Sequence, residues 1–323
     1  MKKIEIFCTL GPSTLNKDFL KFTNKNISLL RLNMSHIDIN KLKKTIVFVR
    51  KFTKVPICID TEGAQIRTKI NKSKKYKINQ EFRIYKNKEK FSFYPNEVFK
   101  KIKKNDLFSL GFEGLEAKVI KIGVNDIKCR VTKEGSIENN KGVHLFNRNI
   151  KLNFLTEKDI AAISIAKKMN IKYFALSFTN SHKDIVNFNK ILKNKTKIFK
   201  IETESAIKNL QKIIRNGERF LIDRGDLSKS VSIEMLPFVQ RKILKTANKK
   251  NKKVYVATNF LESMIKSKEP NRGEANDIYS TLELGASGLV LAAETAIGKY
   301  PKECIAFLKK IIKTFNRFRK HRY

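Results

Sequence analysis

Short apolar runs alternate with amphipathic segments along most of this 323-residue chain. Eight runs have the length and composition of buried strands, and a helix-like stretch follows each of them. They are residues 4–10, 27–32, 55–59, 173–178, 197–202, 220–222, 254–258 and 288–292. Eight strand-then-helix units predict an α/β fold of the (β/α)8 TIM-barrel type. A doubly wound open sheet is the alternative, but it explains eight similar units less economically.

Residues 68–148 interrupt the alternation of strand-like and helix-like segments. Apolar and polar positions alternate there at period two, and several glycines punctuate the alternation, namely Gly111, Gly114, Gly123 and Gly135. This pattern is typical of a small β-rich domain with tight turns. The sequence therefore predicts a β-rich domain inserted after the third barrel strand, with residues 1–67 and 149–323 forming the barrel.

Polar side chains gather at the carboxyl ends of the predicted strands, the face where barrel enzymes hold their active sites. Lys200 and Glu202 are two apart on one strand and point to the same side, and Asp226 follows the next strand. One cation and two carboxylates suit a divalent metal ion and an anionic substrate. The other polar residues at or just past strand ends are Arg31, Asn33, Ser35, His36, Asp60, Thr61, Arg67, Thr258 and Glu294. Any one of them alone is more often a strand-end hydrogen bond than a ligand, and their concentration on one face favours a site.

The sequence excludes several other classes of protein. It contains no Ser-His-Asp or Cys-His pairing and no GxxxxGK[ST] loop, which excludes P-loop chemistry. Its four cysteines are scattered without a Cys-x-x-Cys pair, which argues against a disulfide framework or a zinc site and fits a reducing cytosol. No apolar run approaches the length of a membrane span, and the start of the chain does not read as a signal peptide. We therefore expect a cytoplasmic protein with no membrane partner.

The formal net charge of +39 is the unusual feature of the composition. A chain this basic prompts a nucleic-acid-binding hypothesis. The lysines, however, are spread over the whole chain, and no basic arm or arginine-rich helix stands out. We interpret the charge as compositional drift of the kind that A+T-rich codons produce, and expect no specific nucleic-acid partner. RNA or DNA binding stays the rival interpretation, and in either case the charge attracts anionic substrates.

The chain resembles the pyruvate kinase family over nearly its whole length. The matching motifs follow the family's order and fall on the predicted elements: CTLGPS (8–13), LLRLNMSH (29–36), IDTEGAQIRT (59–68), KGVHL (141–145), LTEKDI (155–160), ALSF (175–178), KIE (200–202), RGDL (224–227), ATNFLESMI (257–265), NRGEAND (271–277) and ETAIGKYP (294–301). The resemblance implies phosphoryl transfer from phosphoenolpyruvate to ADP, the last step of glycolysis. It also implies a homo-oligomer, a lid role for the inserted domain, and a short form without the family's C-terminal domain.

The resemblance also implies a role for each residue of the site. Lys200, Thr258 and Arg31 would be catalytic. Phosphoenolpyruvate would contact Arg31, Lys200, Gly225, Asp226 and Thr258. Glu202 and Asp226 would hold Mg²⁺ or Mn²⁺, and a K⁺ site would comprise Asn33, Ser35, Asp60 and Thr61. The residues around the nucleotide would be Asn33, His36, Arg67 and Lys141.

Several positions depart from the family's motifs. Glu62, Ala64 and Gln65 stand where the family has lysine, proline and glutamate, which affects the hinge into the inserted domain and the K⁺ requirement. Ser228 replaces a glycine. Ala292 replaces a serine whose hydroxyl helps to relay a proton to the enolate. A catalytically weakened relative is therefore one alternative, and a basic nucleic-acid-binding protein on an inherited barrel is another.

Overall fold

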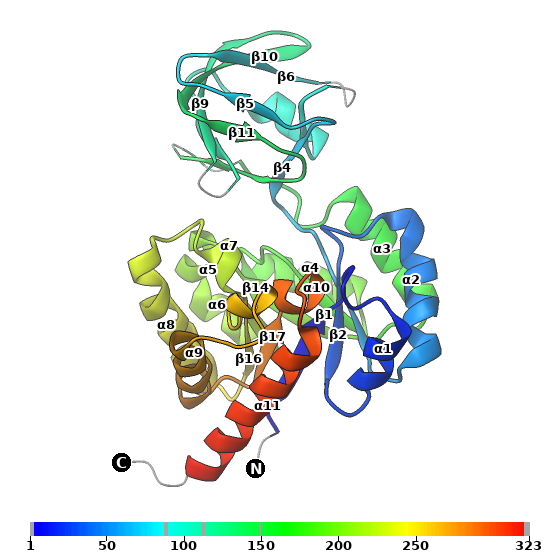
Figure 1. Ribbon diagram of the computed structural model, residues 1–323. Helices are drawn as coiled ribbons and strands as arrows, with labels where there is room; N and C mark the ends of the chain where they lie inside the picture. The colour runs from blue at the N-terminus through cyan, green and yellow to red at the C-terminus, as the bar shows by residue number, and fades with distance from the viewer. Residues whose placement is uncertain (1–2, 87–89, 112–113, 147, 149, 320–323) are drawn as a thin grey trace. The chain divides into compact units, whose positions relative to one another are not determined.

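The computed structural model describes residues 3–86, 90–111, 114–146, 148 and 150–319 (Figure 1). The chain divides into two compact units. One comprises Met1–Gly63 and Glu157–Tyr323, and the other comprises Ala64–Thr156.

The first unit is a closed barrel of parallel strands in the order β1-β17-β16-β15-β14-β13-β3-β2. The strands are β1 (Glu5–Thr9), β2 (Leu29–Asn33), β3 (Ile57–Asp60), β13 (Tyr173–Leu176), β14 (Thr196–Ile201), β15 (Arg219–Asp223), β16 (Lys253–Ala257) and β17 (Gly288–Leu291). Each overlaps one of the eight apolar runs of the sequence. The predicted (β/α)8 fold is therefore confirmed.

Helices connect consecutive barrel strands, as parallel strand order requires. They are α1 (Lys17–Thr23), α2 (Ile39–Phe52), α3 (Glu157–Lys168), α4 (His182–Ile191), α5 (Glu204–Lys208), α6 (Leu210–Asn216), α7 (Arg224–Leu227), α8 (Leu236–Asn248), α9 (Arg272–Glu283), α10 (Ala293–Ala296) and α11 (Pro301–Phe318), with short 3₁₀ turns at Ile233–Met235 and Ser263–Ile265. In α2 the buried residues Leu42, Ile46 and Val49 recur at helical spacing and face the strands. Within the described residues, no helix is both long enough and apolar enough to cross a membrane.

Side chains fill the interior of the barrel. They come from alternate positions of the strands and form one cluster of Phe7, Leu29, Cys58, Ala175, Ile198, Leu221, Tyr255, Ala257 and Val290. Tyr255 is completely buried, and its hydroxyl donates to Glu5 Oε1 at 3.1 Å and accepts from Arg219 Nη1 at 2.9 Å. The interior is thus a packed core, and chemistry on a substrate is confined to the ends of the strands.

The second unit is antiparallel. Its main sheet has the order β6-β10-β9-β8-β12-β4-β7, and β11 pairs with β5 beside it. The strands are β4 (Ile66–Lys69), β5 (Lys74–Tyr76), β6 (Glu81–Tyr85), β7 (Ser92–Tyr94), β8 (Leu107–Leu110), β9 (Leu115–Ile122), β10 (Asp126–Lys133), β11 (Gly135–Ile137) and β12 (Gly142–Leu145), with a 3₁₀ helix at Asn96–Lys101. The unit follows β3 in the chain.

Arg67 is not part of the barrel unit, to which the sequence assigned it. It belongs to β4 of the second unit, opposite Tyr94 of β7 and Gly142 of β12. The reason is that the chain enters the antiparallel sheet at Ile66, before the alternating pattern becomes visible in the sequence.

Candidate active site

The carboxyl ends of β14, β15 and β16 bring one group of polar side chains together. Lys200 lies near the end of β14 and Glu202 directly follows that strand. Asp223 is the last residue of β15, and Thr258 directly follows β16. Neighbouring parallel strands end at the same rim, so residues far apart in the sequence meet here.

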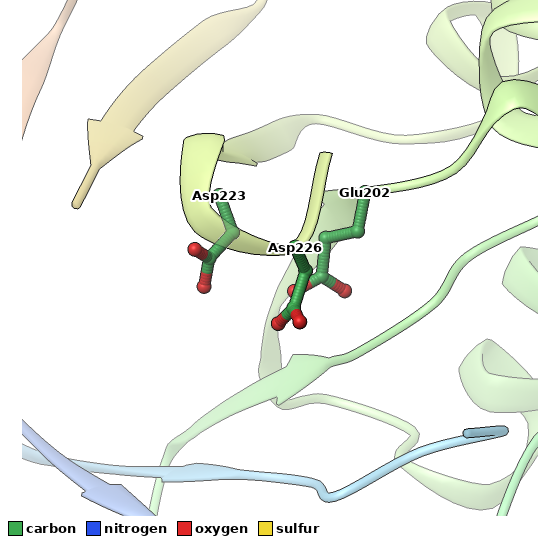
Figure 2. A group of neighbouring side chains, drawn as sticks. All are labelled: Glu202, Asp223 and Asp226. Atoms are coloured by element: carbon green, nitrogen blue, oxygen red, sulfur yellow. The ribbon is translucent and has the colours of Figure 1, made fainter. Parts of the chain in front are cut away.

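Three carboxylates form a compact group at this rim (Figure 2). The ligand oxygens of Glu202, Asp223 and Asp226 all lie within 4.8 Å of one another. Glu202 Oε2 accepts a hydrogen bond from the backbone N–H of Phe178 at 2.6 Å. Glu202 Oε1 is buried and pairs with Lys200 Nζ at 2.7 Å. Oxygen atoms of this kind fit a hard divalent cation such as Mg²⁺ or Mn²⁺.

The ammonium group of Lys200 is surrounded by carboxylates. Its Nζ lies 2.7 Å from Glu202 Oε1, 3.2 Å from Asp223 Oδ2 and 3.5 Å from Asp60 Oδ2, and it donates to Ser177 Oγ at 3.2 Å. Burial by itself lowers the pKa of Lys200, but the three carboxylates outweigh burial and hold that pKa above its ordinary value. Lys200 is therefore a fixed cation at neutral pH.

Glu202 and Asp223 differ in how well their charge is balanced. Burial raises the pKa of Glu202 to about 8, and the attraction of Lys200 offsets this only in part. For Asp223 the attraction of Lys200 and Arg31 outweighs burial and holds the pKa below the usual range. Asp223 thus neutralises cations of the protein, whereas Glu202 has carboxylate charge that a bound cation would stabilise.

Arg31 and Asp60 form a second buried pair at the ends of β2 and β3. Both Nε and Nη2 of Arg31 contact Asp60 Oδ2, and Nη1 donates to Thr9 Oγ1 at 3.0 Å. Asp60 Oδ1 accepts from Ser177 Oγ at 3.3 Å. Burial lowers the pKa of Arg31, but Asp60 and Asp223 reverse this effect and raise it. Arg31 therefore presents a permanent positive charge beside Lys200.

The residues expected to form a K⁺ site lie at the ends of β2 and β3. Asn33 and Asp60 are direct partners in the strand register. Asn33 Oδ1 accepts from the backbone N–H of Ser35 at 3.0 Å, and Thr61 Oγ1 accepts from that of Ser177 at 3.0 Å. Their oxygen atoms suit a hard monovalent cation, but one oxygen of Asp60 is already engaged by Arg31.

The residues expected around a nucleotide divide between the two units. Asn33 and His36 lie at the end of β2 in the barrel unit. Arg67 and Lys141 belong to the second unit, where Arg67 Nη1 donates to the carbonyl of Asn140 at 3.4 Å. Lys141 Nζ pairs with Glu138 Oε2 at 3.0 Å, and both side chains are about half exposed.

Two residues of this network were missed in the sequence. Asp223 contacts Lys200 and Thr258, and its only sequence signal is that it directly follows an apolar run. Ser177 lies inside an apolar run that predicted a longer strand, but β13 ends at Leu176 and frees the Ser177 side chain to bond Asp60 and Lys200. Both residues could be found only by noting where each strand ends.

Glu294 is a strand-end candidate with a structural explanation. Its Oε1 accepts from the backbone N–H groups of Phe260 and Leu261, and its Oε2 accepts from that of Ala292 at 2.8 Å. Both oxygens are therefore committed to holding the loop after β16 against the end of β17.

Fold and site together define an α/β-barrel protein with a lysine and a carboxylate cluster at the carboxyl rim. Residues 1–305 match the family model described as pyruvate kinase, barrel domain. The chain belongs to the pyruvate kinase family.

The similar proteins are longer than this chain, which matches only part of each. A pyruvate kinase of Thermotoga maritima is 32% identical over 337 residues, which cover 97% of this chain and 71% of the relative. Pyruvate kinases of Staphylococcus epidermidis and Staphylococcus aureus are 29% and 30% identical, over 96% of this chain and 56% of their own length. The chain thus spans little more than half the length of the staphylococcal relatives.

Proposed function

We propose that the protein transfers a phosphoryl group from phosphoenolpyruvate to ADP, giving pyruvate and ATP. Membership of the pyruvate kinase family supports this reaction. The single observation that carries it is the placement of Lys200 within 2.7 Å of Glu202, in a carboxylate group that also includes Asp226. A fixed cation beside oxygen ligands for a metal is what transfer of a highly charged phosphoryl group requires.

The proposed mechanism relies on positioning and charge neutralisation, with no covalent enzyme intermediate. Arg31 and Lys200 would bind the phosphoryl group and balance its charge during transfer, and Lys200 would then balance the enolate left behind. The backbone at Gly225 and Asp226 would receive the substrate carboxylate, helped by Thr258. Protonation of the enolate carbon then gives pyruvate, with Thr258 on the side from which the proton arrives.

We assign Mg²⁺, or Mn²⁺ in its place, to Glu202 and Asp226. The convergence of their oxygen atoms and the raised pKa of Glu202 support a cation there. Bound at this position, a divalent ion supplies charge neutralisation for phosphoenolpyruvate. We assign K⁺ to the oxygen atoms of Asn33, Ser35, Asp60 and Thr61. His36, Arg67 and Lys141 are assigned to the ADP phosphates, together with Asn33.

We further propose that the protein works in the cytoplasm as a homo-oligomer. A coupled assay of pyruvate formation tests the reaction itself, with Mg²⁺ or Mn²⁺ and with K⁺ present or replaced by tetramethylammonium. Turnover that needs the divalent ion and rises with K⁺ supports the proposal. Absence of pyruvate formation at saturating phosphoenolpyruvate, ADP and both ions would contradict it.

A further inference from the structure

Asp223 bridges two groups that the proposed function places at the substrate. Its Oδ2 lies 3.2 Å from Lys200 Nζ, and its Oδ1 accepts a hydrogen bond from Thr258 Oγ1 at 2.6 Å. The strand register explains the bridge, because β15 lies between β14 and β16 and Asp223 is directly opposite Ala257. A carboxylate at the end of the middle strand thus reaches the functional residue of each neighbour.

The two residues after Asp223 also contact Thr258. Arg224 donates from Nε to the carbonyl oxygen of Thr258 at 3.0 Å, while Asp277 Oδ2 holds its Nη1 at 2.6 Å. At Gly225, a Cβ atom would lie 2.9 Å from Thr258 Cγ2, so only glycine leaves room for the methyl group. Residues 223–225 therefore fix the hydroxyl, the carbonyl and the methyl group of Thr258.

The backbone of Thr258 shows why this support is needed. Its φ is +82°, a conformation that a β-branched residue rarely adopts because its side chain meets the backbone. Such a conformation persists only where the surrounding structure enforces it, and it is concentrated at functional sites. The contacts from residues 223–225 supply that enforcement.

We propose that Asp223 is a positioning residue, which orients the hydroxyl of Thr258 for the proton-transfer step and ties it to the ammonium group of Lys200. This inference rests on the proposed function. Asp223 acts through these two side chains.

The bond to Thr258 distinguishes Asp223 from the proposed metal ligands. Asp223 belongs to the same oxygen group as Glu202 and Asp226, and Lys200 pairs with both Asp223 and Glu202. Asp223 Oδ1, however, accepts a hydrogen bond from Thr258 Oγ1 at 2.6 Å. A metal ion bound at this oxygen would have to displace Thr258.

Asp223→Asn is the direct test. A carboxylate accepts from two donors at once, but an amide has one accepting oxygen and one donating nitrogen. If the asparagine oxygen accepts from Lys200, its nitrogen faces Thr258 and donates to the hydroxyl, so the hydroxyl proton loses the acceptor that orients it. The step to follow is exchange of the pyruvate methyl protons in D₂O with Mg²⁺ and ATP, observed by NMR. In this exchange a methyl proton leaves to give the enolate, which then takes a deuteron from solvent.

We expect Asp223→Asn to slow this exchange roughly ten- to hundredfold, the usual effect of losing one buried hydrogen bond to a charged group. The KM for phosphoenolpyruvate should not rise, because the variant removes a negative charge beside Lys200 and Arg31. Thr258→Val should slow exchange to a similar extent, and the double variant should be no slower than either single one. The inference would be overturned if the exchange rate of Asp223→Asn stayed within twofold of the parent rate. It would also be overturned if the loss of exchange rate in the double variant equalled the product of the two single losses.

Glu274→Gln is the matched control. Glu274 is also a buried carboxylate of the barrel unit, and it lies at the start of α9. Its carboxylate accepts from the backbone N–H groups of Ser263 and Asn271. This variant should lower the melting temperature and leave the exchange rate per folded molecule unchanged. If it slowed exchange as much as Asp223→Asn, a purely structural role would explain both and the inference would fail.

The inference and the proposed function can fail separately. If the parent protein neither forms pyruvate nor exchanges its protons, the proposed function fails. Thermal unfolding then tests the contact itself, because Thr258→Val should destabilise the parent more than it destabilises Asp223→Asn. If Thr258→Val destabilised the parent and Asp223→Asn equally, the positioning role would be overturned. If it destabilised the parent more, Asp223 would still position Thr258, in a protein with another activity.

Discussion

Glu202 Oε1 lies 2.7 Å from the ammonium group of Lys200, and Glu202 is completely buried. Lys200 shares its single charge with two further carboxylates, those of Asp223 and Asp60. When Glu202 is ionised, these three carboxylates outnumber the two cations Lys200 and Arg31. A divalent cation beside Glu202 would restore the balance, and this relationship leads to the first prediction.

Asp226→Ala should reduce pyruvate formation by more than roughly a hundredfold, because it removes a proposed oxygen ligand of the metal. Asp226 is half-buried and its carboxylate pairs with the nearby Lys229 at 2.7 Å, so the fold should survive. Kinetics at increasing Mg²⁺, with circular dichroism as the folding control, make the measurement. Near-normal turnover at saturating Mg²⁺ would remove Asp226 from the metal site.

Glu202 is less suitable for this test than Asp226. It is completely buried and accepts from the backbone N–H of Phe178. Glu202→Ala would leave that N–H unpaired and would confuse loss of the metal with loss of stability.

Ala292→Ser should raise turnover by up to roughly tenfold, because a hydroxyl at this position can relay a proton toward the enolate. The structure places Ala292 directly after β17, next to the end of β16 that carries Thr258. If proton transfer limits the parent, a solvent isotope effect on its turnover should shrink in the variant. An unchanged rate and isotope effect would show that the missing hydroxyl has no consequence here.

The barrel was predictable because each strand is a separate apolar run. A strand of a parallel barrel is buried on both faces, so nearly every position in runs such as 254–258 and 288–292 is apolar or small, and the period-two signal is absent. The inserted unit was predictable for the opposite reason, since its strands alternate. Its first strand, β4, is short and follows the barrel pattern without a break, which is why Arg67 was assigned to the barrel.

The site was predictable only in part. Lys200, Glu202 and Asp226 were identified because a charged residue at the end of an apolar run is conspicuous. The bridge from Asp223 to Thr258 depends on which strands are neighbours and on their register, and neither is written in local sequence. The positive φ of Thr258 is likewise set by tertiary contacts.

The four cysteines should not react with thiol reagents in the folded protein. All four are buried, and burial raises the pKa of Cys8 and of Cys304 to about 12. A higher pKa leaves less thiolate at pH 8, and the thiolate is the reactive form. Mass spectrometry after iodoacetamide treatment should show almost no labelling in buffer and four labels in guanidinium chloride. Rapid labelling of Cys8, Cys58 or Cys304 in buffer would show that the barrel unit opens readily, and rapid labelling of Cys129 would show the same of the second unit.

Nucleic acid should bind weakly and without sequence preference if the charge of +39 is compositional drift. Binding by scattered lysines depends on counterion release, so it should fall steeply between 50 and 200 mM salt. Fluorescence anisotropy with RNA and DNA of unrelated sequences, over a salt series, measures this. Tight binding to one sequence at about 150 mM salt would favour the nucleic-acid-binding alternative.

Lys141→Ala should raise the KM for ADP roughly five- to tenfold and leave the KM for phosphoenolpyruvate unchanged, because a charge-assisted contact to a nucleotide phosphate would be lost. Lys101→Ala is a matched control from the same unit. Lys101 pairs with Glu97 at 3.1 Å, as Lys141 pairs with Glu138 at 3.0 Å, and all four side chains are 36–50% exposed. Both variants therefore remove one lysine and one surface ion pair. Lys101→Ala also removes a hydrogen bond from Lys101 Nζ to the carbonyl of Lys151 at 2.8 Å, so the melting temperatures of both variants are measured beside the KM values. Equal KM values for ADP in the two variants would show that Lys141 contributes only to the general positive charge.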